Sequence, residues 1–259
     1  MCIANNALWV RRYGQLEARK YADPVALGAA AAADLATIIQ QAVQDRGLAS
    51  IIVATGNSQL RFMEALCARE DIPWSQVVVF HMDEYLGMSA DHPASFRKYI
   101  REKLTDIVHP RAFYGIAGDA PDTAAELESY TRLLAQYPAD ACVMGIGENG
   151  HLAFNDPPAD FTTSETIHVV TLDTACRQQQ VGEGHFRSLD EVPTHALSLT
   201  VPALLKPAHV LVVVPEARKA SAVKAALTGP ITPLCPASIL QAQPHAVVYL
   251  EPASAALLD

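Results

Sequence analysis

Two adjacent carboxylates, Asp83 and Glu84, follow the apolar run VVVFH after Met82. At the end of a buried strand, lost hydration and mutual repulsion raise the pKa of such a pair, and this suits one of them to remove a proton from carbon. We therefore take Asp83 as a candidate base and Glu84 as a candidate substrate contact. Alternatively, one carboxylate is solvated while the other caps a helix or pairs with a lysine. His81 on the same strand face would permit a metal site, but no third ligand lies nearby, so we expect no metal.

A glycine-rich loop, GIGENGHLAFNDP at residues 145–157, follows another apolar run and contains His151. Its glycines allow the backbone to approach a ligand closely, so Gly147 is a candidate substrate contact. Histidine titrates near neutrality and can pass a proton in both directions, while Asn149 and Asp156 could fix its tautomer and orientation. A purely structural histidine is the alternative. The glycine spacing also resembles a dinucleotide-binding fingerprint, but no clear helix opens there and no ribose-binding acid follows.

Two further turns could bind an anion. The run SIIVA is followed by Thr55-Gly56-Asn57-Ser58 and then by a helical segment. A small polar turn at a helix start offers amides, hydroxyls and the positive end of the helix dipole, although an ordinary turn with Ser58 as N-cap is the alternative. The run HVLVVVP is followed by Arg218 and Lys219, cations that oppose a helix dipole unless they bind an anion or are simply solvated. Arg177 is another candidate cation.

These candidate residues follow short apolar runs that alternate with helical segments. The first helix is predicted between an N-cap at Asp23, followed by Pro24, and a C-terminal Gly47. Strands are predicted at residues 50–54, 76–81, 141–145, 167–172, 196–200, 209–214 and 246–250, and further helices at 58–69, 94–104, 122–136 and 216–228. This alternation predicts an α/β fold with a doubly wound, mostly parallel sheet. In such sheets ligands bind beyond the carboxyl ends of the strands, where the candidate residues lie.

Composition limits the classes of partner. The 259 residues contain 19 Lys and Arg against 28 Asp and Glu, a net charge of −9, and half of the residues are hydrophobic. Without a linker or repeat, this predicts one domain spanning residues 1–259. A net negative surface disfavours nucleic acid and anionic membranes, whereas a small anion needs only a few local cations. An odd number of cysteines without CxxC pairs indicates buried reduced thiols, and with no signal peptide or apolar run of about 18 residues we expect a cytoplasmic protein.

Taken together and in this order, the segments TGNS, FHMDEYLGMSADHPASF, GIGENGHLAFNDP and VVPEARKA resemble the glucosamine-6-phosphate deaminase/isomerase family, which is related to 6-phosphogluconolactonase. The resemblance covers about residues 51–251. It implies a modified Rossmann-like, three-layer αβα fold with no metal and no organic cofactor. It also implies a small-molecule sugar-phosphate substrate: glucosamine 6-phosphate would be converted to fructose 6-phosphate and ammonia. The sequence leaves both a monomer and a homo-oligomer open.

The resemblance also implies roles for individual residues. Asp83 matches the base that moves a proton between C2 and C1, and His151 matches the histidine that opens the sugar ring. The carboxylates that assist this histidine fall at Asn149 and Asp156. The phosphate-binding positions fall at the turn Gly56-Asn57-Ser58 and at Lys219.

Several positions depart from the family pattern. An aspartate is usual at Asn149 and a glutamate at Asp156, while the phosphate turn usually reads Gly-Gly-Thr-Pro. The family's second phosphate cation aligns nearest Gln180, and Arg177, one helical turn earlier, is a possible substitute. Positions that bind the activator of regulated members fall around Glu165, Thr166 and His168, which argues against activation at that site.

Three hypotheses follow from these residues. The first is an aldose–ketose isomerase that deaminates a hexosamine 6-phosphate, with another epimer or an unaminated sugar phosphate as variants. The second is a lactonase, which needs His151 to activate water but no carbon-acid base; the continuation LAFNDP after this histidine favours the isomerase. The third is a catalytically silent sugar-phosphate sensor, suggested by Asn149.

Overall fold

The computed structural model describes residues 6–182 and 184–258. Its strands are β1 (Trp9–Tyr13), β2 (Leu16–Lys20), β3 (Ala49–Val53), β4 (Val77–His81), β5 (Asp83–Tyr85), β6 (Ala112–Tyr114), β7 (Ala141–Met144), β8 (Ile167–Thr171), β9 (His195–Leu199), β10 (His209–Val214) and β11 (Ala246–Leu250). Its α-helices are α1 (Pro24–Arg46), α2 (Leu60–Cys67), α3 (Phe96–Ile100), α4 (Asp106–Val108), α5 (Thr123–Gln136), α6 (Thr174–Gly182), α7 (Val201–Leu205) and α8 (Ala220–Thr228). Shorter helical turns are η1 (Asn57–Gln59), η2 (Trp74–Gln76), the π-turn η3 (Arg101–Thr105), η4 (Leu189–Glu191), η5 (Ala217–Lys219) and η6 (Pro236–Ala242).

The main sheet has the strand order β1-β2-β11-β10-β7-β3-β4-β6. All neighbouring strands run parallel except the edge pair β1 and β2. Every residue of β3, β4 and β7 is buried, as strands covered by helices on both faces must be. The predicted doubly wound, mostly parallel sheet is confirmed.

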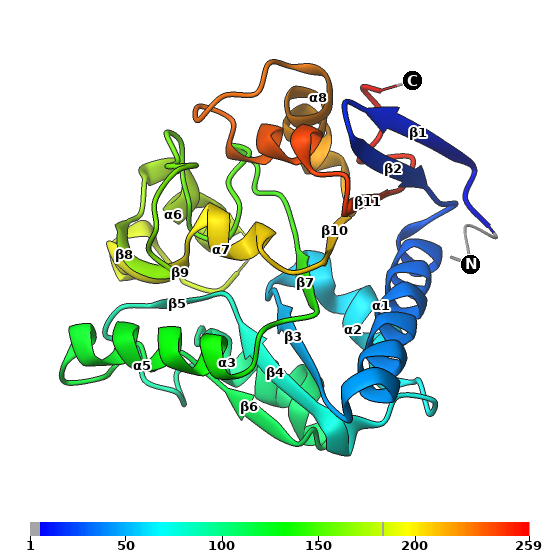
Figure 1. Cartoon of the computed structure of the whole chain (residues 1–259). Coiled ribbons are helices and arrows are strands. Elements are labelled where there is room, and N and C mark those ends of the chain that lie inside the picture. Colours follow the sequence, from blue (N-terminus) through cyan, green and yellow to red (C-terminus); the bar gives the residue numbers. More distant parts are fainter. Residues whose placement is uncertain (1–5, 183, 259) are drawn as a thin grey trace.

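Helices cover both faces of this sheet (Figure 1). Alternate residues of β3 point to opposite sides, so that Ile51 packs with α1 and α2, while Ile52 lies in the cluster that includes Tyr130 of α5 and Val223 of α8. The two apolar clusters make three layers, helices–sheet–helices. The carboxyl ends of β3, β4, β7 and β10 therefore open at one edge between the two helical layers.

A second, antiparallel sheet of three strands has the order β5-β9-β8. The sequence predicts β8 and β9 as strands, but the main sheet does not contain them. After the buried Ile167, the residues of β8 alternate between partly buried and exposed, a pattern that suits a sheet with one solvated face. Their partner is β5, in which Asp83 pairs with Ser198 and Glu84 with Leu197. This small sheet fixes the direction of the carboxylate pair, and sequence reasoning did not anticipate it.

The first helix follows its predicted signals. The Asp23 side chain accepts a hydrogen bond from the Ala26 N–H, and Gly47 ends the helix with φ of 74°. By length and composition α1 is also long and apolar enough to cross a membrane, with a window of mean hydropathy 1.3. Its stripe, which includes Leu27 and Leu35, is buried against the main sheet and α2, as in a core helix.

Four cysteines lie in the described part of the chain, and all four are free thiols. Cys142 and Cys176 are buried, whereas Cys67 and Cys235 are only partly buried. The prediction of reduced thiols is confirmed for these four, and the prediction of burial for two of them. Cys2 lies outside the described residues.

Candidate active site

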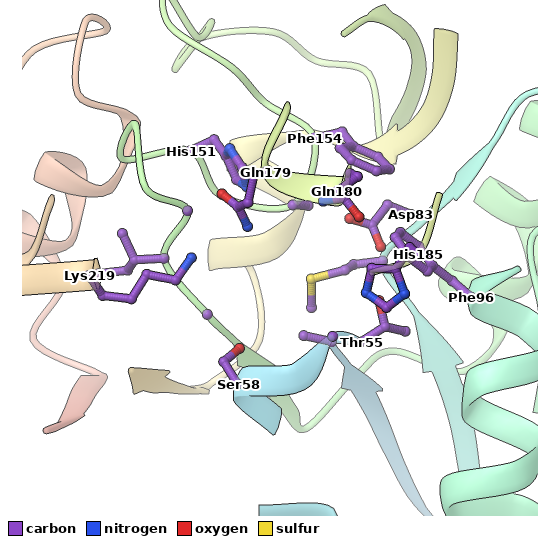
Figure 2. A pocket seen from close by; sticks show the side chains of 17 residues that line it. Thr55, Ser58, Asp83, Phe96, His151, Phe154, Gln179, Gln180, His185 and Lys219 are labelled. Carbon is purple, nitrogen blue, oxygen red and sulfur yellow. The ribbon is translucent and has the colours of Figure 1, made fainter. Parts of the chain in front are cut away.

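One cavity opens at the carboxyl ends of β3, β4, β7 and β10 (Figure 2). It brings together candidate residues from four segments that are far apart in the sequence. The lining consists of Ala54, Thr55, Gly56, Ser58, Met82, Asp83, Phe96, Gly145, Ile146, Gly147, His151, Ala153, Phe154, Gln179, Gln180, His185 and Lys219. Figure 2 shows Lys219 and Asp83 on opposite sides of this cavity, with the His151 ring above and Ser58 below. The end with the Lys219 ammonium and the end with the Asp83 carboxylate thus face each other across it.

Asp83 lies at the end of the cavity opposite Lys219 and is only 7% exposed. Its Oδ1 has no hydrogen-bond donor in the described part of the protein. Burial, together with the charge of neighbouring Glu84, raises the pKa of Asp83 to about 8. A carboxylate that has lost its hydration and gained no donor is a strong base for its type, which is what removal of a carbon-bound proton requires.

The His151 ring stands over Gly147. A Cβ at position 147 would lie 2.3 Å from the imidazole Cε1 and Nε2, so only glycine leaves room for the ring. The other ring nitrogen, Nδ1, lies 3.2 Å from Asp156 Oδ1. This pair leaves Nε2 as the nitrogen that can exchange a proton with a ligand.

Asn149 and Asp156 lie behind the histidine and do not line the cavity. The Asn149 amide donates to Asp156 Oδ1 at 3.0 Å and approaches Asp173 Oδ2 at 3.4 Å, while its oxygen accepts the His151 backbone N–H. Burial alone would raise the pKa of Asp156, but hydrogen bonds from His151, Asn149 and the Asp173 N–H outweigh it and lower the pKa below its usual value. An ionised Asp156 is thus held against His151. Asn149 thus lies between the carboxylates of Asp156 and Asp173, both of which an aspartate at this position would repel.

The side chains of His151, Asp156 and Cys176 each offer one possible metal ligand within 4.8 Å of one another. Asp156 already accepts hydrogen bonds from Asn149 and from the Asp173 backbone. Burial raises the pKa of the Cys176 thiol well above its usual value, which disfavours the thiolate that binds metal. The hydrogen-bond network around His151 accounts for this cluster without a metal.

The turn after β3 forms the lower wall. Thr55, Gly56 and Ser58 line the cavity, and Gly56 has φ of 95°, a conformation that favours glycine. Asn57 faces two neighbouring grooves instead of this cavity. The Tyr99 hydroxyl donates to the Gly56 carbonyl at 2.9 Å and fixes the turn from the side of α3.

Lys219 enters from the turn after β10 and is only 3% exposed. Glu216 begins this turn with φ of 83°, which is strained for a residue with a side chain. Its N–H donates to the buried Glu251 carboxylate at 2.9 Å, so the end of β11 holds the turn in place. Arg218 pairs with Glu148 at 2.8 Å and does not line the cavity.

Besides Asn57, two further predicted contacts, Glu84 and Arg177, do not line the cavity. Glu84 is fully buried, and its oxygens accept hydrogen bonds from the start of α3. The Arg177 guanidinium donates to the carbonyls of Leu189 and Val192. The structure thus corrects both assignments: Glu84 acts as a helix cap, the alternative that the sequence left open, and Arg177 holds a loop.

Several residues that line the cavity were not predicted from the sequence. Gln179, Gln180 and His185 come from α6 and the loop after it, a helix that the sequence analysis did not predict. Gln180 is buried and accepts a hydrogen bond from the Tyr85 hydroxyl at 2.8 Å. The aromatic side chains of Phe96 and Phe154 stack at a centroid distance of 5.6 Å and form an apolar wall. The alignment with the family pointed to Gln180 alone, as the position of a missing cation.

The geometry can be compared with known proteins. The family model described as glucosamine-6-phosphate isomerases/6-phosphogluconolactonase matches residues 22–249. The chain belongs to this family. Its relatives include the glucosamine-6-phosphate deaminase of Streptococcus pyogenes serotype M1, which is 32% identical over 214 residues, or 83% of this chain and 89% of the relative. The enzyme of the same name from Exiguobacterium sibiricum is 34% identical over 210 residues, which cover 81% of each chain.

Solved structures of the glucosamine-6-phosphate isomerase/6-phosphogluconolactonase family agree with the fold. A monomeric glucosamine-6-phosphate deaminase superposes with a TM-score of 0.84 at 28% identity, over 93% of this chain and 99% of that chain. A 6-phosphogluconolactonase from Shewanella baltica OS155 superposes with a TM-score of 0.74 at 23% identity, over 90% and 97% of the two chains. The second comparison shows a shared fold, and both confirm the predicted αβα architecture.

Proposed function

We propose that this protein is a glucosamine-6-phosphate deaminase, an isomerase that converts glucosamine 6-phosphate and water to fructose 6-phosphate and ammonia. The observation that carries the proposal is the position of Asp83. A buried carboxylate without a donor on Oδ1 faces His151 in a cavity whose far side holds Lys219. The relatives at 32% and 34% identity that bear this enzyme's name support the same substrate.

The phosphate is the end of the substrate that the cations bind. Lys219 would pair with it, and the hydroxyls of Thr55 and Ser58 would donate to its oxygens. Binding energy gained at this remote group positions C1 and C2 at the opposite end, next to the acid–base residues. Gly56 and Gly147 keep the backbone close to the ligand.

The histidine would act first. His151 Nε2 moves a proton between the ring oxygen and the C1 hydroxyl, which opens the pyranose to the aldehyde. Asp156 keeps the ring oriented and stabilises its protonated form, and Asn149 keeps Asp156 in place. The family usually has two carboxylates that assist this histidine. Here one carboxylate, Asp156, and one amide, Asn149, stand at those positions.

The carboxylate would act next. Asp83 removes the proton from C2 and returns a proton to C1, so that the amine-bearing carbon becomes an imine. Water adds to this C2 imine and ammonia leaves, which gives the ketone of fructose 6-phosphate. The apolar wall of Phe96 and Phe154 limits water near Asp83 and maintains its high pKa.

The test measures ammonia and fructose 6-phosphate from glucosamine 6-phosphate, with galactosamine 6-phosphate and 6-phosphogluconolactone as competing substrates. We expect ammonia release, and a loss of about 100- to 10,000-fold in Asp83→Asn. Lactone hydrolysis without ammonia from either hexosamine phosphate would overturn the proposal in favour of a lactonase. Ligand-induced thermal stabilisation with no turnover would overturn it in favour of a sensor.

We further propose that the enzyme is cytoplasmic and works on a small molecule, without nucleic acid or a membrane. Its net charge of −9 supports this, because an extended polyanion needs a broad basic surface. The structural neighbour that is a monomeric enzyme supports an active site contained in one chain. Size-exclusion chromatography with light scattering distinguishes a monomer from a homo-oligomer.

A further inference from the structure

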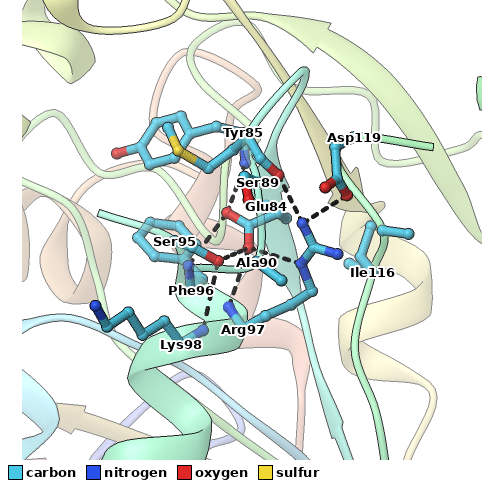
Figure 3. A network of polar contacts seen from close by, with 12 residues as sticks. Glu84, Tyr85, Ser89, Ala90, Ser95, Phe96, Arg97, Lys98, Ile116 and Asp119 are labelled. Carbon is cyan, nitrogen blue, oxygen red and sulfur yellow. Dashed lines mark hydrogen bonds and ion pairs between the residues drawn. The ribbon is translucent and has the colours of Figure 1, made fainter. Parts of the chain in front are cut away.

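Glu84 is a fully buried carboxylate next to the candidate base, and it does not line the cavity. Its oxygens accept four hydrogen bonds (Figure 3). Oε1 accepts the backbone N–H groups of Tyr85 and Phe96, while Oε2 accepts the Ser95 hydroxyl at 2.7 Å and the Arg97 N–H at 3.0 Å. Burial raises the pKa of Glu84 above its usual value, and these four donors oppose that rise because they stabilise the ionised carboxylate.

These hydrogen bonds join two walls of the cavity. Glu84 belongs to β5, directly after Asp83, and three of its four donors belong to the start of α3. Phe96 is the first residue of α3 and lines the cavity. The distance between Asp83 and the Phe96 wall therefore depends on the Glu84 side chain.

A second layer of contacts holds Glu84 itself. Arg97 Nε lies 3.4 Å from Glu84 Oε2, and its Nη2 donates to the Met88 carbonyl at 2.6 Å and to Asp119 at 2.8 Å. The loop that carries Asp119 packs tightly on β5, since a Cβ at Gly118 would lie 2.2 Å from the Tyr85 carbonyl oxygen. Four segments thus converge on one buried charge.

Charged and titratable groups from several elements face Asp83 and Glu84. The described groups that interact electrostatically with Asp83 are Glu84 from β5, Tyr130 from α5, Cys142 from β7 and Cys176 from α6. The cavity adds His151, His185 and Lys219, and Glu84 itself faces Arg97 from α3. His81 from β4 is buried and neutral, because burial and Arg97 lower its pKa to about 3. Arg97 divides its charge between Glu84 and Asp119. Glu84 is the neighbouring carboxylate whose charge raises the pKa of Asp83.

We propose that Glu84 is a positioning residue for the proposed deaminase reaction. Its buried carboxylate ties β5 to the start of α3 and keeps a negative charge beside Asp83, so that Asp83 is held in place at the cavity next to a fixed charge. The inference rests on the proposed function for its catalytic meaning. The effect of Glu84 on Asp83 can nevertheless be measured in the protein without substrate.

The first test needs no substrate. Carboxyl carbons of labelled aspartate are titrated by NMR in the full-length protein, and Asp83→Asn identifies the Asp83 signal. We expect Asp83 to titrate near pH 8 in the unaltered protein. In Glu84→Gln we expect its midpoint to fall by about one pH unit or more, because the neighbouring charge is gone. An unchanged midpoint in Glu84→Gln, or a midpoint near 4 in the unaltered protein, overturns the proposal.

A matched control separates charge from loosened packing. Ser95→Ala removes one hydrogen bond to Glu84 and the N-cap of α3, but it keeps the Glu84 charge. We expect its Asp83 midpoint to stay within about 0.3 pH unit of the unaltered protein. A fall as large as that in Glu84→Gln would show that loosening alone explains the effect, which contradicts the proposal.

A conservative variant covers a possible folding failure of Glu84→Gln. Glu84→Asp keeps the charge but is one methylene shorter, so we expect a midpoint near that of the unaltered protein and a raised KM. A midpoint lowered by about one unit in Glu84→Asp contradicts the proposal.

Activity gives an independent readout of the same effect. The acid limb of kcat/KM should move to lower pH in Glu84→Gln, whereas Ser95→Ala should lower kcat/KM at every pH without moving the limb. A limb that does not move in Glu84→Gln contradicts the proposal. If the unaltered protein releases no ammonia, the proposed function fails, and the NMR titration still decides the role of Glu84.

Discussion

Gly147 lies directly under the His151 ring, so that a Cβ at position 147 would fall 2.3 Å from Cε1 and Nε2. Gly147→Ala must therefore displace the ring from Asp156. Because a misplacement of about 1 Å in a catalytic group costs on the order of 100-fold, we expect kcat to fall by about that factor. Steady-state kinetics of Gly147→Ala checks this. Gly182→Ala is the control, since a Cβ there meets nothing within 4 Å. A kcat in Gly147→Ala equal to that of Gly182→Ala contradicts the assigned position of the ring.

The raised pKa of Asp83 makes stability depend on pH. Its pKa is about 8 in the folded protein and near 3.8 when unperturbed, so folding favours the protonated form. This stabilisation is fully present below about pH 4 and is lost as the pH rises through 8. Asp83→Asn removes the ionisable group, so we expect its free energy of unfolding to exceed that of the unaltered protein increasingly from pH 5 to 9. Chemical denaturation at several pH values measures the difference, and a difference independent of pH would argue against a raised pKa.

Asn149 separates Asp156 from Asp173. Asn149→Asp adds a third carboxylate within hydrogen-bond distance of Asp156 Oδ1, which should raise the pKa of the new group. A carboxyl group whose pKa is raised in the folded protein adds stability only at low pH, where it is protonated. Asn149→Asp should therefore be less stable than the unaltered protein by about 1–2 kcal/mol at pH 8. The deficit should shrink toward pH 5. Thermal unfolding of Asn149→Asp beside Asn149→Ala, which loses the same hydrogen bonds without adding charge, tests this; equal deficits at both pH values contradict it.

Lys219 is the only lysine or arginine that lines the described cavity. Lys219→Met removes a charge-assisted contact to the phosphate, which corresponds to roughly 100-fold in KM if the lost interaction is about 3 kcal/mol. Glucosamine without phosphate serves as the control substrate, because its turnover should not depend on this lysine. Equal losses on both substrates would show that Lys219 supports the fold and not the phosphate.

Much of the main sheet could be predicted because its strands are short, apolar on both faces and separated by well-signalled helices. The cap at Asp23 and the C-terminal Gly47 lie where their chemistry predicts. The edge strand β1, WVRRY, is mostly exposed and charged, so it carries no apolar run that would reveal it. The three residues of β5 became a strand only through pairing with β9, a contact more than 100 residues away in the sequence. No local pattern encodes such a pairing.

For the site, spacing after strands was enough to place Asp83, His151 and Lys219 at one cavity. Residue type alone did not show that Glu84 points away from Asp83, because two adjacent strand residues face opposite sides. The position of Arg177 could not be predicted for a similar reason. Its guanidinium donates to two carbonyls of a loop whose path the sequence does not reveal. His185 could have been suspected from the run GEGHF, in which a histidine follows two glycines.

The most direct measurement of the central claim is turnover of glucosamine 6-phosphate in heavy water. Ammonia is assayed, and deuterium at C1 of the fructose 6-phosphate is followed by NMR. If Asp83 removes the C2 proton, exchanges it with solvent and then protonates C1, the unaltered protein releases ammonia and places solvent deuterium at C1, and Asp83→Asn does neither at a rate within about 100-fold. Ammonia release and deuterium incorporation by Asp83→Asn at the unaltered rate would contradict the account.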